Sequence, residues 1–117
     1  MIAVIFELKT SEAHKQHYLS LAADLKPYLA DIEGFISIER FQSLVEPDKI
    51  LSLSFWENEE AIKAWRNLEV HRLAQAQGRA SILEFYRLRV ASVIRDYGLN
   101  LRDEAPIDSA KYHQNVK

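Results

Sequence analysis

Four short segments of the chain show the two-residue alternation of side chains that is typical of β-strands. The first is Ile2 to Leu8, and the others are 35–43, 50–56 and 86–95. Two longer segments between them carry apolar residues at three- and four-residue steps, which is the pattern of a helix packed on one side. The predicted order along the chain is therefore strand, helix, strand, strand, helix, strand.

The first helix is expected to begin at Thr10 or Ser11, because a short hydroxyl side chain can accept a hydrogen bond from the free amides of the first turn. Pro27 lies within the helical pattern and predicts a kink or a break near Lys26, since proline lacks an amide hydrogen and crowds the preceding turn. The apolar stripe comprises Tyr18, Leu21, Ala22, Leu25, Leu29 and Ile32.

The second helix is expected to be capped by Asn58 and to bury Ala61, Ile62 and Trp65. Its periodicity weakens over 67–70, which predicts an interruption, followed by further turns over 69–77 with Gly78 as the C-cap. Residues 81–85 are expected to form a connecting turn before the last strand.

This order of elements predicts an α+β fold, the ferredoxin-like βαββαβ subunit, with a four-stranded antiparallel sheet and both helices on one face. Two helices cover only one face, yet the strands carry apolar residues on both, such as Ile5 opposite Val4 and Phe6. A second copy packed sheet on sheet would cover the other face, so the sequence predicts a homodimer.

Three arginines, Arg87, Arg89 and Arg95, share one face of the last strand. An anion site is one interpretation. Because Ala91 and Val93 lie between them, we expect instead that they form ion pairs across the dimer with acidic residues of the first two strands, namely Glu7 or Glu39.

Length and composition fit one domain over residues 1–96, followed by a polar tail over 97–117 that is extended or packs on the partner subunit. Fifteen basic and seventeen acidic residues give a net charge of -2 without any block of like charge, so neither nucleic acid nor a membrane surface is an expected partner. The absence of cysteine excludes disulfides, thiolate nucleophiles and cysteine-held metals. No leader or long apolar run is present, which predicts a cytoplasmic protein.

Two stretches, SFWENEEAIKAWRNLEVHRLAQAQGR and the following YRLRVASVIR, resemble the antibiotic biosynthesis monooxygenase family, and GFISIERFQS fits the same pattern. The resemblance extends from Ile2 to Arg95. It implies a dimeric α/β barrel of ferredoxin-like subunits, each with a pocket between its sheet and its helices.

Characterised members of that family fall into two groups. One oxidises aromatic phenols to quinones with molecular oxygen and without a metal or flavin, and the other binds and degrades heme. The leading hypothesis is therefore a monooxygenase that needs no metal and no bound cofactor, and that combines oxygen with a small electron-rich aromatic or quinol-like molecule.

In this hypothesis His71 acts as the base or proton shuttle, since imidazole titrates near neutral pH, and Asn67 with Arg72 stabilises the developing anion. Trp65 shapes the pocket, and further substrate contacts are expected from Trp56, Tyr18 and Tyr86. The structural alternatives are core packing for the tryptophans and tyrosines, and capping or solvation for the polar residues.

Two other functions are left open. For heme degradation His71 would be the iron ligand, but it follows Trp65 by only six residues, and Phe6 and Glu7 stand where those relatives carry an asparagine. The remaining alternative is a non-enzymatic dimer, a small-molecule-binding or stress-related protein. His14 and His17 have a spacing that can chelate a metal, but without a third ligand we expect no metal site there.

Overall fold

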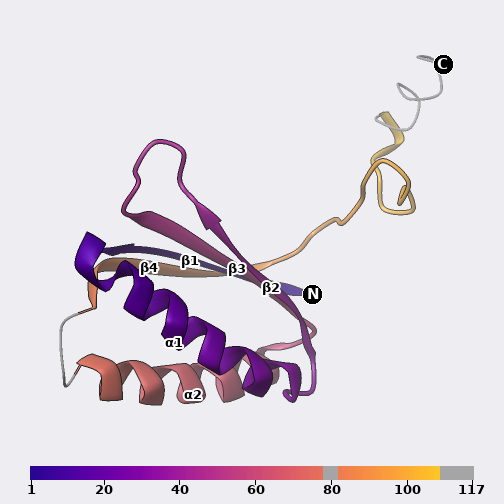
Figure 1. Ribbon diagram of the computed structural model, residues 1–117. Helices are drawn as coiled ribbons and strands as arrows, with labels where there is room; N and C mark the ends of the chain where they lie inside the picture. Colours follow the sequence, from indigo (N-terminus) through magenta and orange to yellow (C-terminus); the bar gives the residue numbers. More distant parts are fainter. Residues whose placement is uncertain (78–81, 109–117) are drawn as a thin grey trace.

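The structure is a computed structural model that describes the backbone of residues 1–77 and 82–108, and the side chains of residues 1–68 and 82–108. Its elements are β1 (Ile2–Thr10), α1 (Glu12–Ala30), β2 (Phe35–Gln42), β3 (Lys49–Trp56), α2 (Glu59–Gln77) and β4 (Leu83–Ser92), as Figure 1 shows. This order confirms the predicted ferredoxin-like α+β fold.

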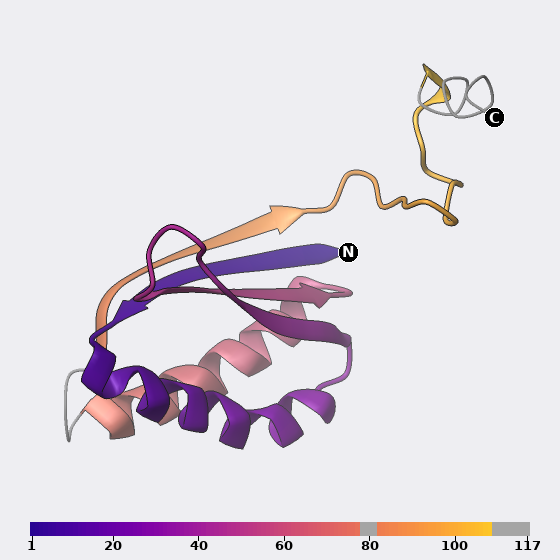
Figure 2. The ribbon, with the colours of Figure 1, turned by 45° about the horizontal axis from the view of Figure 1, so that its top comes forward.

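The four strands form one sheet in the order β2-β3-β1-β4, and each neighbouring pair is antiparallel. Both helices lie on the same side of the sheet (Figures 1 and 2), so the sheet has a helix-covered face and an open face. On β3 the helix-covered face carries Ile50, Ser52, Ser54 and Trp56, which are buried, and the open face carries Leu51, Leu53 and Phe55, which are half-buried. The more apolar face of this strand is thus the one that the helices leave open.

Two separate apolar clusters fill the layer between the helix-covered face and the helices. The tryptophan cluster comprises Val4, Leu29, Trp56, Ala61, Ile62 and Trp65. The tyrosine cluster comprises Phe6, Leu8, Tyr18, Ile50 and Ile82. Along β3, Ser52 and Ser54 lie between the two clusters, so the core is divided by small polar side chains.

Both helices are continuous, which corrects the prediction of a break near Lys26 and that of an interruption over 67–70. α1 runs through Pro27 to Ala30, because Leu25 and Leu29 on either side of the proline are buried against the sheet and hold the last turns in place. α2 runs through 67–70 without interruption, since this segment contains neither glycine nor proline and a weak apolar pattern does not by itself end a helix.

The cap of α2 is confirmed, because the Ala61 amide donates to Asn58 Oδ1 at 3.0 Å. Ser11 is the N-cap residue of α1, but its hydroxyl lies 2.7 Å from Nδ1 of His14 and makes no capping hydrogen bond. The predicted C-cap at Gly78 lies outside the described residues.

The last strand begins and ends earlier than predicted, since β4 covers Leu83–Ser92 rather than 86–95. Its register explains the difference. Thr10 pairs with Leu83 at one end and Ile2 with Ser92 at the other, so β1 offers no partner strand beyond Ser92. One further hydrogen bond joins the Val93 amide to the Met1 carbonyl, after which the chain leaves the sheet.

The open face contains an ion pair within one chain, which corrects the expectation for Arg89. Its Nη1 lies 3.3 Å from Oε2 of Glu7 on the neighbouring strand β1, so this pair does not need a second subunit. In the described part of the chain, no helix combines the length and the apolar character that crossing a membrane requires.

After β4 the chain runs away from the body on the side of the open face (Figures 1 and 2). Residues 96–105 then fold on themselves. The Gly98 amide donates to the Leu101 carbonyl, Arg102 donates to the Gly98 carbonyl, and the Asp96 amide donates to Glu104. Leu99 and Leu101 stay exposed on this tail.

Candidate functional site

Side chains that are neighbours across the strands form rows on the helix-covered face of the sheet. We call this surface, which faces the helices, the floor of the site. In the central row, Arg40 of β2, Ser52 of β3, Phe6 of β1 and Leu88 of β4 are neighbours in register. Ser52 and Phe6 are buried in the middle of the row, whereas Arg40 is half-buried at one end and Leu88 is exposed at the other. The row therefore connects the two long edges of the sheet beneath the helices.

The tryptophans of the site stand together at one end of this layer. The Trp56 and Trp65 rings are 5.6 Å apart between centroids, and Phe35 packs edge-on against Trp56 at 5.1 Å. The indole N–H of Trp56 donates to Ser54 Oγ at 2.9 Å, which fixes the ring on the floor. Trp56 is fully buried and belongs to the core, while Trp65 joins the same cluster from α2.

The two predicted tyrosines lie on the other side of the serine pair and differ in exposure. Tyr18 of α1 is 2% exposed within the tyrosine cluster. Tyr86 of β4 is 63% exposed and stacks edge-on against Phe6 with the centroids 5.8 Å apart. The ring of Tyr86 thus lies at the open edge of the floor, where an incoming molecule would meet it first.

The predicted polar residues all lie on α2, in the part of the helix beyond Trp65. Asn67 is exposed. Position 72 follows Trp65 by nearly two full turns of about 3.6 residues each, so their backbones share one side of the helix, and position 71 lies about a third of a turn away. The side chains of His71 and Arg72 lie outside the described part of the structure.

Arg40 was not identified from the sequence. Its Nε is buried, and the guanidinium has no hydrogen-bond or ion-pair partner among the described side chains, those of residues 1–68 and 82–108. It follows Ile38 by two residues, so the two side chains lie on the same face of the strand. Because Ile38 packs against the core, this spacing could have placed Arg40 on the helix-covered face. A bulge between Phe35 and Ser37 obscured that phase, since it leaves Ile36 exposed and turns Phe35 toward the core.

An open pocket of about 290 Å³ lies between the first turns of α2 and β4. Its lining comprises Glu59, Glu60, Ile62, Lys63, Arg66 and Val90. Val90 belongs to the next row on the same face of the sheet. Its neighbours in that row are Val4 and Ser54. This pocket is therefore an approach from solvent to the floor of the site.

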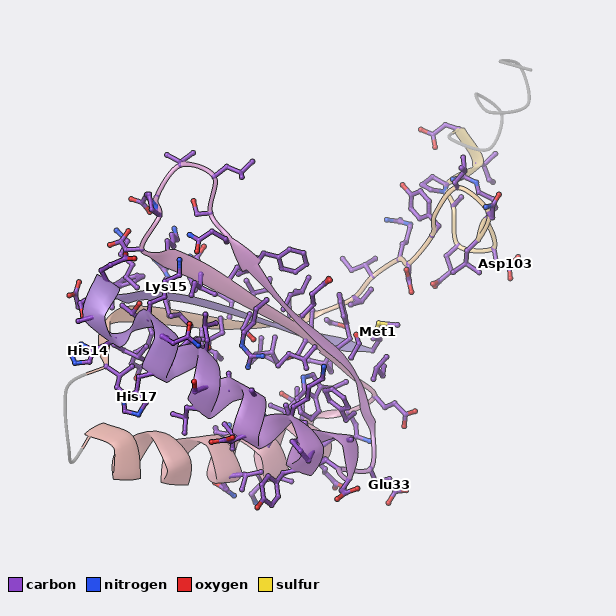
Figure 3. The ribbon with its side chains drawn as sticks, viewed as in Figure 1. Met1, His14, Lys15, His17, Glu33 and Asp103 are labelled. Carbon is purple, nitrogen blue, oxygen red and sulfur yellow. The ribbon has the colours of Figure 1, made fainter. Side chains whose placement is uncertain are left out.

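The histidine pair of α1 lies outside this layer. His14 and His17 lie on the N-terminal half of the helix (Figure 3), where the half-buried His14 contacts Ser11 through its ring and His17 is exposed. Among the described residues, no group of three histidine, aspartate or glutamate side chains is arranged to hold a metal ion.

Comparison with known proteins adds to this geometry. Residues 1–77 match the model of the family described as antibiotic biosynthesis monooxygenase. The chain is 46% identical over 93 residues to a jasmonate monooxygenase of Pyricularia oryzae, covering 80% of this chain and 43% of that protein. The chain thus spans less than half the length of this relative. It is also 35% identical to YqjZ of Bacillus subtilis, an uncharacterized protein, over 80% of this chain and 79% of that one.

Two solved structures share the fold at low sequence identity. SnoaB of Streptomyces nogalater, a cofactor-independent oxygenase, aligns with a TM-score of 0.63 and 12% identity over 81% of this chain and 94% of its own. MhuD with bound manganese protoporphyrin IX aligns with a TM-score of 0.66 and 19% identity over 84% of this chain and 99% of its own. The same subunit fold therefore occurs in a cofactor-independent oxygenase and in a protein that binds a porphyrin.

Proposed function

Because this chain belongs to the antibiotic biosynthesis monooxygenase family, we propose that it is an oxygen-dependent monooxygenase that uses no metal and no bound organic cofactor. Its substrate is a small electron-rich aromatic or quinol-like molecule bound between the helix-covered face and the helices. The observation that carries this assignment is the divided core, in which Trp65 and the buried serines border a floor that opens beside β4.

Such a reaction needs a substrate that supplies its own electrons. When a ring methylene of an anthrone-type molecule becomes a quinone carbonyl, the substrate loses four electrons to one O₂, one oxygen atom enters the product, and the other leaves as water. The protein's part is to remove the first proton, to exclude water and to hold the resulting anion beside oriented donors. A substrate without an acidic, electron-rich ring would need an added reductant, because it could not itself supply the electrons that reduce O₂.

In our proposal, residues of α2 remove the proton and hold the anion. Trp65 forms the wall against which a planar ring stacks, and Tyr86 and Tyr18 border the ring from β4 and α1. His71 takes the proton, and Arg72 stabilises the bound anion. Asn67 is exposed, so it contributes at the mouth of the site rather than at its floor.

We expect the His71→Ala variant to consume oxygen about 10²- to 10⁴-fold more slowly than the wild type, which is the usual contribution of a general base. The measurement is oxygen uptake with a panel of anthrones, anthrols and hydroquinones. His17→Ala, which removes an exposed histidine of α1, is the matched control and should keep the wild-type rate. If no member of the panel is oxidised, a non-enzymatic binding protein becomes the better assignment.

Heme degradation is the second candidate, favoured by the shared fold with MhuD. Against it, Phe6 presents an apolar ring to the floor, and Glu7 lies on the open face paired with Arg89, so β1 offers no amide to a bound heme. We therefore expect a titration with hemin to leave no saturable Soret band. A band at one heme per subunit that is lost in His71→Ala would reverse the order of the two candidates.

We further propose that the protein works as a two-fold dimer joined through the open face. That face carries the apolar side chains Ala3, Ile5, Phe41, Leu51, Leu53, Phe55 and Phe85. Among the described residues no helix covers this face, although three of the five apolar residues of β3 lie on it. The tail over 97–108 extends past the same face, where it would lie against the second subunit (Figure 2).

A further inference from the structure

We propose that Arg40 and Ser52 form an anchor for a carboxylate, so that the substrate of this site is an aromatic acid whose carboxylate lies at the β2 end of the central row. This inference rests on the proposed function only for the electron-rich character of the ring. The anion site itself follows from the placement of the two side chains.

The first observation is the unpartnered guanidinium. Arg40 lies on the helix-covered face, its Nε is buried, and in the described part of the chain it has neither a hydrogen bond nor an ion pair. Placing a cation partly out of water is costly unless an anion or several acceptors replace the lost hydration. An arginine in this position is therefore suited to an anion that arrives from outside the chain.

The second observation is the neighbour of Arg40 in the row. Ser52 is its cross-strand partner, is 3% exposed and lies on the same face of the sheet. A guanidinium presents paired N–H groups that match the two oxygens of a carboxylate, and a serine hydroxyl adds one further donor. A single arginine balances a single negative charge, which favours a carboxylate over a phosphate ester.

The third observation is the change from polar to apolar side chains along the row. Beyond Ser52 come Phe6 and Leu88, so the floor is polar at the β2 end and apolar from β1 to β4. Three strand spacings of about 4.8 Å separate the ends, roughly 14 Å in all, which is enough for a carboxylate followed by a two-ring body. The row thus orients the acid with its rings toward the pocket between α2 and β4.

The test uses 2-naphthoate and its methyl ester, which have the same rings but differ in charge and are not oxidised under the assay conditions. We expect calorimetry to show that the wild type binds the acid about 10- to 100-fold more tightly than the ester, as is usual for a charge-assisted pair of hydrogen bonds. Arg40→Met should bind both equally weakly, and Arg40→Lys should recover part of the preference. Arg95→Met, which removes an exposed arginine beyond β4, should behave as the wild type.

A melting curve without ligand separates this role from a purely structural one. Because the guanidinium has no partner among the described residues, Arg40→Met should melt at the same temperature as the wild type or a few degrees above it. Equal binding of acid and ester by the wild type, binding of neither, or unchanged acid binding by Arg40→Met would overturn the assignment, and so would a marked loss of melting temperature in that variant. Since the naphthoates report binding alone, failure of this test and failure of the oxygenase assay are distinguishable.

Discussion

Replacing Leu53 by aspartate is expected to convert the proposed dimer into a monomer. Leu53 is at the centre of the open face, where its neighbours in register are Ile5 on β1 and Glu39 on β2. In a sheet-on-sheet dimer this position is buried, and a buried carboxylate without a partner costs several kcal/mol. We therefore expect the dimer dissociation constant to rise at least about 100-fold, equivalent to roughly 2.7 kcal/mol.

Sedimentation velocity over a range of protein concentrations measures this change. The matched control is Leu44→Asp, because Leu44 is a fully exposed leucine in the turn between β2 and β3 and its replacement should leave the dimer intact. Monomeric wild type at all concentrations, or an unchanged dimer in Leu53→Asp, would show that the open face is not the interface.

The second large effect is expected from Trp56→Ala, which should lower the free energy of unfolding by about 3 to 5 kcal/mol, the usual cost of removing a large buried aromatic side chain. Trp56 is 0% exposed, packs against Phe35 and Trp65, and is held by its hydrogen bond to Ser54. Its loss removes the centre of the tryptophan cluster and leaves the wall of the site without support.

Denaturant unfolding at one fixed protein concentration gives this free energy. Trp56→Phe is the control, since it keeps most of the ring packing and loses only the indole N–H, for which about 1 to 2 kcal/mol is expected. If alanine at this position costs no more than phenylalanine does, Trp56 does not have the structural role assigned to it, and its ring would be available to a ligand.

The order of elements was predictable from the sequence because each strand alternates with a two-residue period and each helix begins with a clear apolar pattern. The ends were less predictable, since they depend on partners rather than on local pattern. β4 stops at Ser92 because β1 starts at Ile2, and no feature of the β4 sequence itself marks that point. Likewise, α1 continues through Pro27 because the leucines around it are buried.

The candidate site was only partly predictable, because the sequence did not show which face of each strand lies beneath the helices. Trp65 was identified because an aromatic residue in phase with a helix face points to the core, and the structure places it there. Arg40 and Ser52 were not identified, because the bulge at 35–37 shifts the phase of β2 and because β3 turns its serines, not its leucines, toward the helices. A small polar residue can be recognised as part of a buried site only when the position of the helices that cover it is known.

The fold alone does not determine the reaction, since the same subunit serves oxygenases and a porphyrin-binding protein. In this chain an apolar Phe6 lies in the central row, and Arg40, which has no partner among the described residues, lies at its end. Together they favour an acid with an electron-rich ring over a heme.

The central claim, oxidation of such a molecule without a metal or bound cofactor, is tested most directly with ¹⁸O₂. Protein freed of metals by chelation and shown by its visible spectrum to contain no heme is incubated with the most rapidly oxidised member of the panel, and the product is analysed by mass spectrometry. We expect one ¹⁸O atom per product molecule, at a rate that chelation does not change. Product without the label, or activity that returns only when a metal or heme is added, would contradict this account.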